Sequence, residues 1–352
     1  MPTTYDFVAQ NKRRTWLLVL LFPITFALLG MVFLFGYQYV CELGETPTQA
    51  DSYHAYVNNV NLQTTTPASR AIENTARIGM IALPAFWLLA MLWILFSYFS
   101  GDQMILHGAG AIKISKRSQP EIYRLVENLC ISVGLPTPQI YIIDDESLNA
   151  FATGRDPKHA SIALTKGIVK RLEPVELEGV IAHELSHIRN RDIRLMLITV
   201  AGISFCTFLA EICFRMALNM SRSRSSSSGK SDGNALPIIC FAVGLCLAIY
   251  GYLVAPLIRL AISRTREYQA DATAALMTRN PGALARALEK ISADPRVEVL
   301  DAHASMAAMC IANPLSKKSF FAWISGILAT HPPTEKRIAA LRTMDADVLQ
   351  SR

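Results

Sequence analysis

Charged side chains are scarce in this chain of 352 residues, because Asp, Glu, Lys and Arg together make up 18% of it. A typical soluble domain has roughly 25%. The shortage is concentrated in long stretches that carry no charge, and 51% of all residues are apolar. This composition excludes a disordered chain, a collagen and a coiled coil. It indicates an α-helical integral membrane protein with a substantial part in water.

Paired cysteines are missing as well. None of the seven Cys residues belongs to a CxxC motif, and four lie in apolar stretches, namely Cys206, Cys213, Cys240 and Cys246. In such stretches Cys behaves as a small hydrophobe, so neither a disulfide framework nor a cysteine-based zinc site is expected. The formal net charge is only +6. The basic residues flank the apolar runs. This placement indicates that they orient the chain in the membrane, and it does not indicate a nucleic-acid partner.

Two apolar runs near the N-terminus, residues 16–40 and 78–99, contain no charged residue. Each is about long enough to cross a bilayer core of roughly 30 Å. The first run is too long for the apolar part of a signal peptide and no small-residue cleavage pattern follows it, so it predicts a retained anchor. Residues 12–14 are basic, and the positive-inside rule therefore places the N-terminus in the cytoplasm and the loop 41–77 outside. We expect an N-terminal membrane region over residues 1–100.

The other two apolar runs are less regular. Residues 195–210 are short for a span and are followed by Glu211, whereas residues 236–258 are long enough. A Ser-rich loop over residues 221–234 lies between them. Two interpretations stay open: a membrane hairpin over residues 195–262, or a buried helical hairpin at the membrane surface. The hairpin interpretation predicts about four transmembrane helices in the whole chain.

The two remaining segments, residues 101–194 and 263–352, face water. We expect them to be the two halves of one α+β domain, mostly helical with a short sheet. Apolar residues recur at helical spacing in the first half, and Pro174 favours the start of a helix. The elements expected there are helices over residues 120–133 and 174–190 and strands over residues 139–143 and 160–164.

The helix that starts at Pro174 carries the motif His183-Glu184-Leu185-Ser186-His187. Residues four apart share a helix face, so both imidazoles can reach one metal ion. Zinc suits this set, because it accepts neutral His nitrogens and keeps one position open for water. Glu184 lies beside that position and can take a proton from the water. Chance is the competing interpretation, but two His and a Glu on a partly buried helix need partners, and a metal is the simplest one.

Two His ligands leave a catalytic zinc one protein ligand short, and the third can be a His or a carboxylate. Glu267 and Asp271 are four apart and therefore share a helix face. One of them could bind zinc while the other orients a ligand imidazole. The alternative is a solvated acidic face paired with Arg264 and Arg266. The spacing alone does not decide between the two.

Four stretches, taken together and in this order, carry a family resemblance. They are Asn149-Ala150-Phe151-Ala152-Thr153-Gly154, the HExxH motif with Asn190 and Asp192 behind it, Glu267 through Ala270-Asp271, and His331-Pro332-Pro333 with Arg337. With them the chain resembles the HtpX-type membrane zinc peptidases. These are relatives of the CAAX prenyl endopeptidases, in the group whose third zinc ligand is a glutamate. The resemblance covers roughly residues 101–344 and the four-run membrane pattern.

The resemblance implies one Zn2+ per chain, with Glu267 as the third ligand beside His183 and His187. Asp271 would contact one of these ligand side chains without binding the zinc itself. Asn149, Ala150, Phe151 and Ala152 would then belong to the edge strand or loop that receives the substrate backbone. An unpaired strand suits this task, because strand addition binds peptides with little regard to their sequence.

The resemblance also gives His331 a role: it would lie over the zinc and steady the tetrahedral intermediate of the reaction. Arg337 would hold His331 or the nearby carboxylates. A donor aimed at a developing oxyanion is in general a large catalytic contribution. From the residues alone, His331 is equally well a helix-start His ahead of a proline turn.

The function implied by the resemblance is a zinc metalloendopeptidase of the bacterial cytoplasmic (inner) membrane. Its N-terminus and active site would be cytoplasmic, and it would clear misfolded or damaged membrane proteins under stress. Expected partners are polypeptide substrates, the lipid bilayer, and a second copy or other membrane quality-control proteins. One alternative is a prenyl-protein processing protease, although those relatives carry more membrane spans. Another is a non-catalytic membrane scaffold with a structural metal, which would need no general base such as Glu184. The long loop 41–77 and the Ser-rich loop depart from the family pattern.

Overall fold

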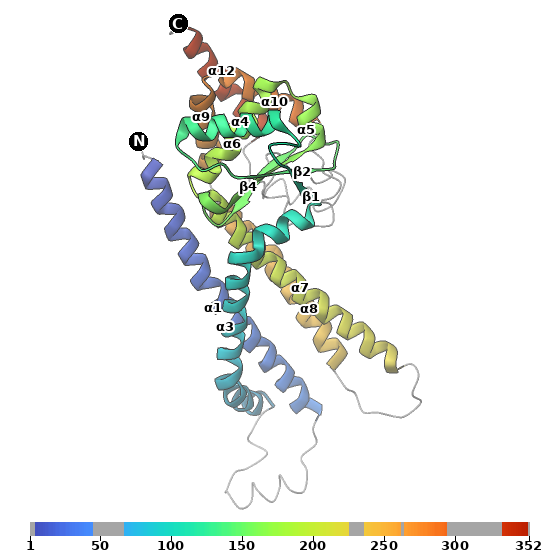
Figure 1. Cartoon of the computed structure of the whole chain (residues 1–352). Helices are drawn as coiled ribbons and strands as arrows, with labels where there is room; N and C mark the ends of the chain where they lie inside the picture. The colour runs from blue at the N-terminus through green and yellow to red at the C-terminus, as the bar shows by residue number, and fades with distance from the viewer. Residues whose placement is uncertain (1–3, 45–66, 225–235, 262–263, 294–332, 351–352) are drawn as a thin grey trace, which may run out of the picture. The chain divides into compact units, whose positions relative to one another are not determined.

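A computed structural model describes most of the chain (Figure 1). The residues it describes are 4–44, 67–224, 236–261, 264–293 and 333–350. The predicted His331, most of the loop 41–77 and most of the Ser-rich loop lie outside these residues. The described residues confirm a mostly helical protein with one short sheet. The chain divides into two compact units, one made of residues 1–17, 95–203 and 253–352 and the other of residues 18–94 and 204–252.

The sheet belongs to the first unit and has four strands. They are β1 (Ala111–Lys113), β2 (Gln139–Ile143), β3 (Ala150–Gly154) and β4 (Ala160–Thr165). Their order in the sheet is β1-β2-β4-β3, with β2 and β4 parallel and both outer pairs antiparallel. Both strands predicted from the sequence are confirmed. Three of the four residues that the family resemblance assigns to substrate binding, Ala150 to Ala152, lie in β3. This strand is at one edge of the sheet.

A tight turn joins β3 to β4 through the short 3-10 helix η1 (Pro157–His159). Gly154 ends β3 with φ +135, a conformation that side chains disfavour, and a Cβ atom there would overlap the carbonyl oxygen of His159. The Asp156 carboxylate accepts hydrogen bonds from the backbone N–H groups of Lys158 at 2.9 Å and His159 at 3.0 Å. These contacts fix the conformation of the turn.

Six α-helices accompany the sheet in the described part of this unit, apart from the ends of the long apolar helices. They are α4 (Pro120–Val133), α5 (Lys166–Arg171), α6 (Pro174–Arg189), α9 (Arg264–Thr278), α10 (Pro281–Ala293) and α12 (Thr334–Gln350). Helix α4 begins at Pro120 and ends at Gly134 in the left-handed conformation, so its predicted bounds are confirmed. Helix α6 begins at Pro174, and the Glu176 carboxylate accepts the N–H of Glu173 at 2.9 Å.

Helix α6 is the centre of the core, because it contacts β3, α4, α9 and α10. Ile181 and Leu185 on α6 are fully buried, in one apolar cluster with Ile162 of β4. Burying such a side chain contributes about 1.5–3 kcal/mol. Gly179 brings α6 close to α10, since a Cβ atom there would lie 3.2 Å from Leu284. A helix held on so many sides presents its polar residues in fixed positions.

Four long helices contain the predicted apolar runs, and each extends beyond its run. They are α1 (Thr4–Gly44), α3 (Pro67–Gly108), α7 (Asp192–Arg224) and α8 (Leu236–Ala261). Among the described residues, the stretches Ala71–Gly108 and Asp192–Met220 are long and apolar enough to cross a membrane. The other two helices carry the shorter apolar stretches Phe26–Tyr39 and Pro237–Tyr250.

The second unit has a small apolar core of its own and many apolar side chains outside it. The core contains Phe26, Ala90 and Phe205, and the rings of Trp93 and Phe205 stack at 5.1 Å. By contrast, Met80 and Ile81 on α3 are 75% and 79% exposed. Long helices that expose apolar side chains and lack charge are suited to lipid rather than to water. The protein is a membrane protein.

Candidate metal centre

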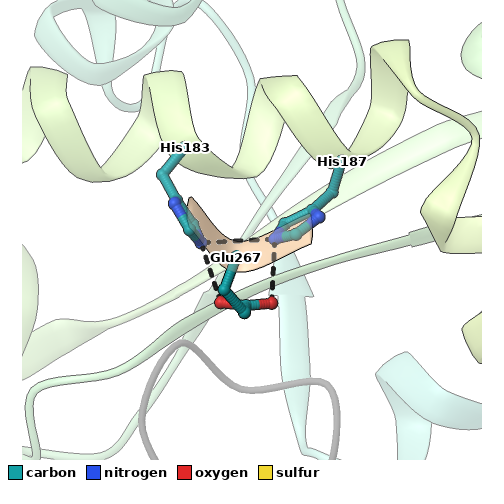
Figure 2. A group of neighbouring side chains, drawn as sticks. All are labelled: His183, His187 and Glu267. Atoms are coloured by element: carbon teal, nitrogen blue, oxygen red, sulfur yellow. Dashed lines mark hydrogen bonds and ion pairs between the residues drawn. The ribbon is translucent and has the colours of Figure 1, made fainter. Parts of the chain in front are cut away.

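His183 and His187 lie one turn apart on α6 and point toward the carboxylate of Glu267 on α9 (Figure 2). The two Nε2 atoms are 3.2 Å apart. The Glu267 oxygens lie 3.7 Å from these nitrogens, Oε2 from His183 and Oε1 from His187. One ligand atom from each residue lies within 4.8 Å of the others, and all three side chains are buried. The structure therefore brings the three predicted ligands together.

These separations fit a tetrahedral zinc ion. Ligand atoms at about 2.0–2.2 Å from zinc in tetrahedral geometry are about 3.4 Å from one another. The observed 3.2 and 3.7 Å bracket this value. Two imidazole nitrogens and a carboxylate oxygen are also a donor set typical of catalytic zinc, with a fourth position open. The His183, His187 and Glu267 set forms a metal site.

Each ligand imidazole is held on its far side by a carboxylate. His183 Nδ1 lies 3.0 Å from Asp271 Oδ1, and His187 Nδ1 lies 3.0 Å from Asp192 Oδ2. Each ring donates its Nδ1–H to the carboxylate, which leaves the lone pair on Nε2. Both Nε2 atoms therefore face the metal position as acceptors. This arrangement fixes the tautomer and the angle of both rings.

Each of these carboxylates is in turn held by a buried Arg. Arg337 of α12 donates to Asp271 twice, from Nε to Oδ2 at 2.8 Å and from Nη2 to Oδ1 at 2.7 Å. Its Nη1 also lies 3.6 Å from Glu267 Oε2. On the other side, Arg266 Nη1 donates to Asp192 Oδ1 at 3.2 Å. The metal site thus rests on two chains of contacts, each of Arg, carboxylate and His.

The charges of this group stabilise one another. Burial opposes ionisation of Asp271, but the Arg337 guanidinium and the His183 ring outweigh it and hold the pKa of Asp271 below its usual range. Burial also opposes the charge of Arg337, and the carboxylates of Asp271 and Glu267 outweigh it and raise the Arg337 pKa. Both groups are therefore charged at neutral pH.

The alternative of a solvated acidic face on α9 is wrong. Glu267 is 0% and Asp271 2% exposed. Asp271 pairs with Arg337 of α12, while Arg266 pairs with Asp192 and lies 4% exposed. The reason is packing, since this face of α9 lies against α6. The side chain of Arg264 is outside the described residues.

Glu184 follows the first ligand in the chain and is 2% exposed. Its carboxylate accepts a hydrogen bond from the backbone N–H of Ala152 on β3. Burial raises the pKa of Glu184 to about 7, and nearby His187 works in the opposite direction. A carboxyl group in this range can both accept and release a proton near neutral pH.

Along the edge strand β3, the backbone N–H and C=O groups of alternate residues point away from β4. Phe151 pairs with Ala163 and Thr153 with Ser161 of β4, while Ala152 turns its N–H outward to Glu184. Asn149 fixes the start of the strand, because its N–H donates to Thr165 Oγ1 and its Oδ1 accepts the N–H of Ala150, both at 3.0 Å. The structure thus places Ala152, one of the four predicted substrate residues, next to Glu184.

Two residues of this site have no role that the sequence predicts. Asp192 belongs to the stretch behind HExxH, and Arg266 is expected only as a partner of a solvated acidic face. Asp192 begins α7 directly after the turn at Arg191, whose φ is +60, and this turn brings its carboxylate back to His187. No local pattern could have indicated that Arg266 would meet Asp192, 74 residues earlier.

Several known proteins are similar to this chain. The family model "Peptidase family M48" matches residues 116–345. A "Protease HtpX homolog" of Bacteroides fragilis is 40% identical over 334 residues, which is 95% of this chain and 96% of that protein. Proteins of the same description from Dictyoglomus turgidum and Streptococcus pneumoniae are 35% and 33% identical, each over 97% of this chain and over 95% and 99% of their own length. A crystal structure of S. mikatae Ste24p aligns with 97% of this chain and 99% of its own, at a TM-score of 0.39 and 16% identity.

Proposed function

The chain belongs to peptidase family M48, and on that premise we propose that it is a zinc endopeptidase of the bacterial cytoplasmic membrane that cleaves misfolded or damaged membrane proteins. One observation carries the proposal. Ligand atoms of His183, His187 and Glu267 lie within 4.8 Å of one another, with the buried Glu184 beside them. A structural metal site needs no such base, so this arrangement favours a catalytic site. We assign it one Zn2+ per chain.

The chemistry that a zinc ion supplies at this site is Lewis-acid activation of water and of the scissile carbonyl. Glu184 takes the proton of the attacking water on its carboxylate and returns it to the leaving amine. Its bond to the Ala152 N–H keeps the carboxylate next to β3. His331 donates to the developing oxyanion, and Arg337 and Asp271 hold His183 in place.

The substrate binds as an additional strand at β3, over Asn149, Ala150, Phe151 and Ala152. This strand is the edge of the sheet, with β4 as its only neighbour among the described strands. Binding through backbone groups asks little of the side chains. It suits an enzyme whose substrates are unfolded polypeptides of varied sequence.

In the membrane we propose four spans, with the N-terminus and the active site in the cytoplasm. His187 and Glu267 meet at one site, so the chain between them crosses the bilayer an even number of times. Helices α7 and α8 then form a hairpin and Ser226 lies outside. Thiol labelling of a Ser226→Cys protein free of other Cys tests this. Reagent that reaches the thiol only from the cytoplasmic side would instead support a surface hairpin.

Cleavage by the full-length protein in liposomes tests the proposed activity. The substrates are casein, a misfolded membrane protein and a prenylated peptide, each with and without a metal chelator. We expect cleavage of the first two, its loss with the chelator and its return with zinc. Preference for the prenylated peptide would favour a processing protease, and cleavage that survives chelation would overturn the metallopeptidase mechanism.

A further inference from the structure

The turn between β3 and β4 lies against the last turns of the apolar part of α3. The guanidinium carbon of Arg155 is 5.4 Å from the ring centroid of Phe99, and its Nη1 reaches the Phe99 carbonyl oxygen at 3.5 Å. Arg194, in the first turn of α7, has its guanidinium carbon 5.7 Å from the ring centroid of Tyr98. Its Nε donates to the carbonyl oxygen of Arg155 at 2.7 Å. Two guanidinium groups are therefore held over two neighbouring aromatic rings.

The scaffold under these guanidinium groups is rigid. Tyr98 and Phe99 contact each other edge to face at 5.2 Å. The turn that carries Arg155 is fixed by Gly154 and by the Asp156 hydrogen bonds. Little side-chain entropy remains to be lost when a ligand binds two arginines held in this way.

The guanidinium groups keep donors for a ligand. Within the described part of the chain, the two terminal nitrogens of Arg194 and Nη2 of Arg155 meet no carboxylate. Asp156 lies 3.9 Å from Arg155 Nε and is bound instead by the His159 ring at 2.9 Å. Asp192, next to Arg194 in helix α7, is occupied by His187 and Arg266. The Arg155 side chain is 24% exposed, so solvent and ligands can reach it.

Further positive charge lies close by in the sequence, where the acids Asp156 and Asp192 are already bound to other residues. Lys158, Arg189 and Arg191 are all exposed. Planar guanidinium groups with spare donors match the oxygens of both carboxylates and phosphates. Basic residues near a membrane meet phosphate-bearing headgroups, so a phosphate group is the oxyanion expected here.

The aromatic rings indicate which phosphate it is. Tyr98 and Phe99 end the uncharged run 78–99 of α3, and Asp102 is the first charged residue after it. Phe99 is 56% exposed. Aromatic residues at the end of a membrane helix lie at the level of the headgroups, and arginine stems there extend along apolar surface toward water. A free nucleotide or phosphate would need neither feature.

We propose that Arg155 and Arg194 form a binding site for the phosphate of an anionic phospholipid headgroup. The site rests on the membrane location of α3 and is independent of the peptidase chemistry. A headgroup bound there holds the β3–β4 turn at the bilayer surface. Because Gly154 at the end of β3 directly precedes Arg155, the edge strand is then held where segments of membrane proteins leave the lipid.

Native mass spectrometry of the full-length protein in detergent tests this site by titration with phosphatidylglycerol and, separately, with phosphatidylcholine. The measured quantity is the ratio of the two affinities within each variant, so a general loss of stability cancels. Arg155→Gln keeps the backbone carbonyl that Arg194 holds, and we expect it to reduce the ratio about fivefold. Arg155→Gln with Arg194→Gln should reduce it by about one order of magnitude or more.

Arg117→Gln with Arg124→Gln is the matched control, because it removes two exposed positive charges elsewhere in the first unit. It should leave the ratio unchanged. An unchanged ratio in Arg155→Gln, or an equal loss in the control, would overturn the site. The phosphatidylglycerol titration is then repeated in the presence of excess inorganic phosphate. Displacement of phosphatidylglycerol by this phosphate would mean a free-anion site and would overturn the lipid assignment.

Discussion

Arg337 and Asp271 form a two-contact ion pair, 2.8 Å from Nε to Oδ2 and 2.7 Å from Nη2 to Oδ1, that joins α12 to α9 beneath the metal site. Arg337 is 1% exposed, and Asp271 in turn reaches His183 Nδ1 at 3.0 Å. The orientation of one metal ligand thus depends on a helix 154 residues further along the chain. Arg266, Asp192 and His187 repeat the pattern for the other imidazole.

Arg337→Lys should weaken metal binding while leaving all three ligands in place. Lysine keeps the charge but offers no planar fork to the two Asp271 oxygens, so the His183 ring becomes less well oriented. Loss of such supporting contacts costs about 10–100-fold in metal affinity. Chelator competition at equilibrium measures the zinc affinity.

The control for this change is Arg342→Lys on the same helix, where the arginine is exposed and pairs with Glu289. Exposed pairs contribute little, so its zinc affinity should match the wild type. Equal zinc affinity in Arg337→Lys and in the control would mean that the ion pair is only structural.

Arg266 should act on the metal site through Asp192. Arg266→Met removes the guanidinium that meets Asp192 Oδ1 at 3.2 Å and leaves a buried carboxylate less well compensated. Breaking a buried pair in this way costs about 3–5 kcal/mol of unfolding free energy. Asp192→Asn removes the charge of the carboxylate instead. The double variant, Arg266→Met with Asp192→Asn, should therefore lose much less unfolding free energy than the sum of the losses in the two single variants. Thermal unfolding of the four proteins measures the coupling, and strictly additive losses would refute it.

His331→Ala should lower the cleavage rate by about 10²–10³-fold if His331 donates to the oxyanion. Zinc content and folding should be unchanged, because His331 is not proposed as a ligand. Only an interaction stronger in the transition state than in the ground state has this effect on rate. Metal analysis run beside the rate assay identifies the failure: an empty site in His331→Ala would make His331 a ligand and the role of Glu267 wrong.

Asp156→Asn should destabilise the protein in a pH-dependent way. Burial opposes the charge of Asp156, but the bonds from the His159 ring and from the N–H groups of His159 and Lys158 outweigh it and lower the Asp156 pKa. The pKa of Asp156 is thus lower in the folded than in the unfolded protein. Ionised Asp156 therefore stabilises the fold at pH values above the unfolded pKa. This stabilisation is lost as the pH falls through the folded pKa. The Tm difference from the wild type should be present above about pH 4, the unfolded pKa of Asp, and should shrink as the pH falls below it through the folded pKa. A difference that does not shrink on acidification would contradict this origin.

The half of the metal site that lies on one helix could be predicted from the sequence. His183 and His187 are four residues apart, and the geometry of a helix alone brings their rings to one side. The bounds of α4 and α6 followed from Pro120, Gly134 and Pro174, because these residues limit the backbone at their own positions.

The other half depends on contacts that no local pattern contains. Glu267 lies 80 residues from His187 in the numbering, and spacing left it undecided between ligand and solvated side chain. Only the family resemblance singled it out. The strand β3 is buried on both faces, so it lacks the alternation that marks a half-buried strand. Three-residue β1 was too short to recognise.

Glu184→Gln is the measurement that tests the mechanism most directly. Glutamine keeps the size of the side chain and leaves His183, His187 and Glu267 untouched, but it is not a base at neutral pH. The full-length variant should bind zinc as the wild type does while cleavage of casein falls by a factor of at least about 10². Metal analysis and the rate are measured on the same sample. Wild-type turnover by a folded, zinc-loaded Glu184→Gln protein would contradict the account.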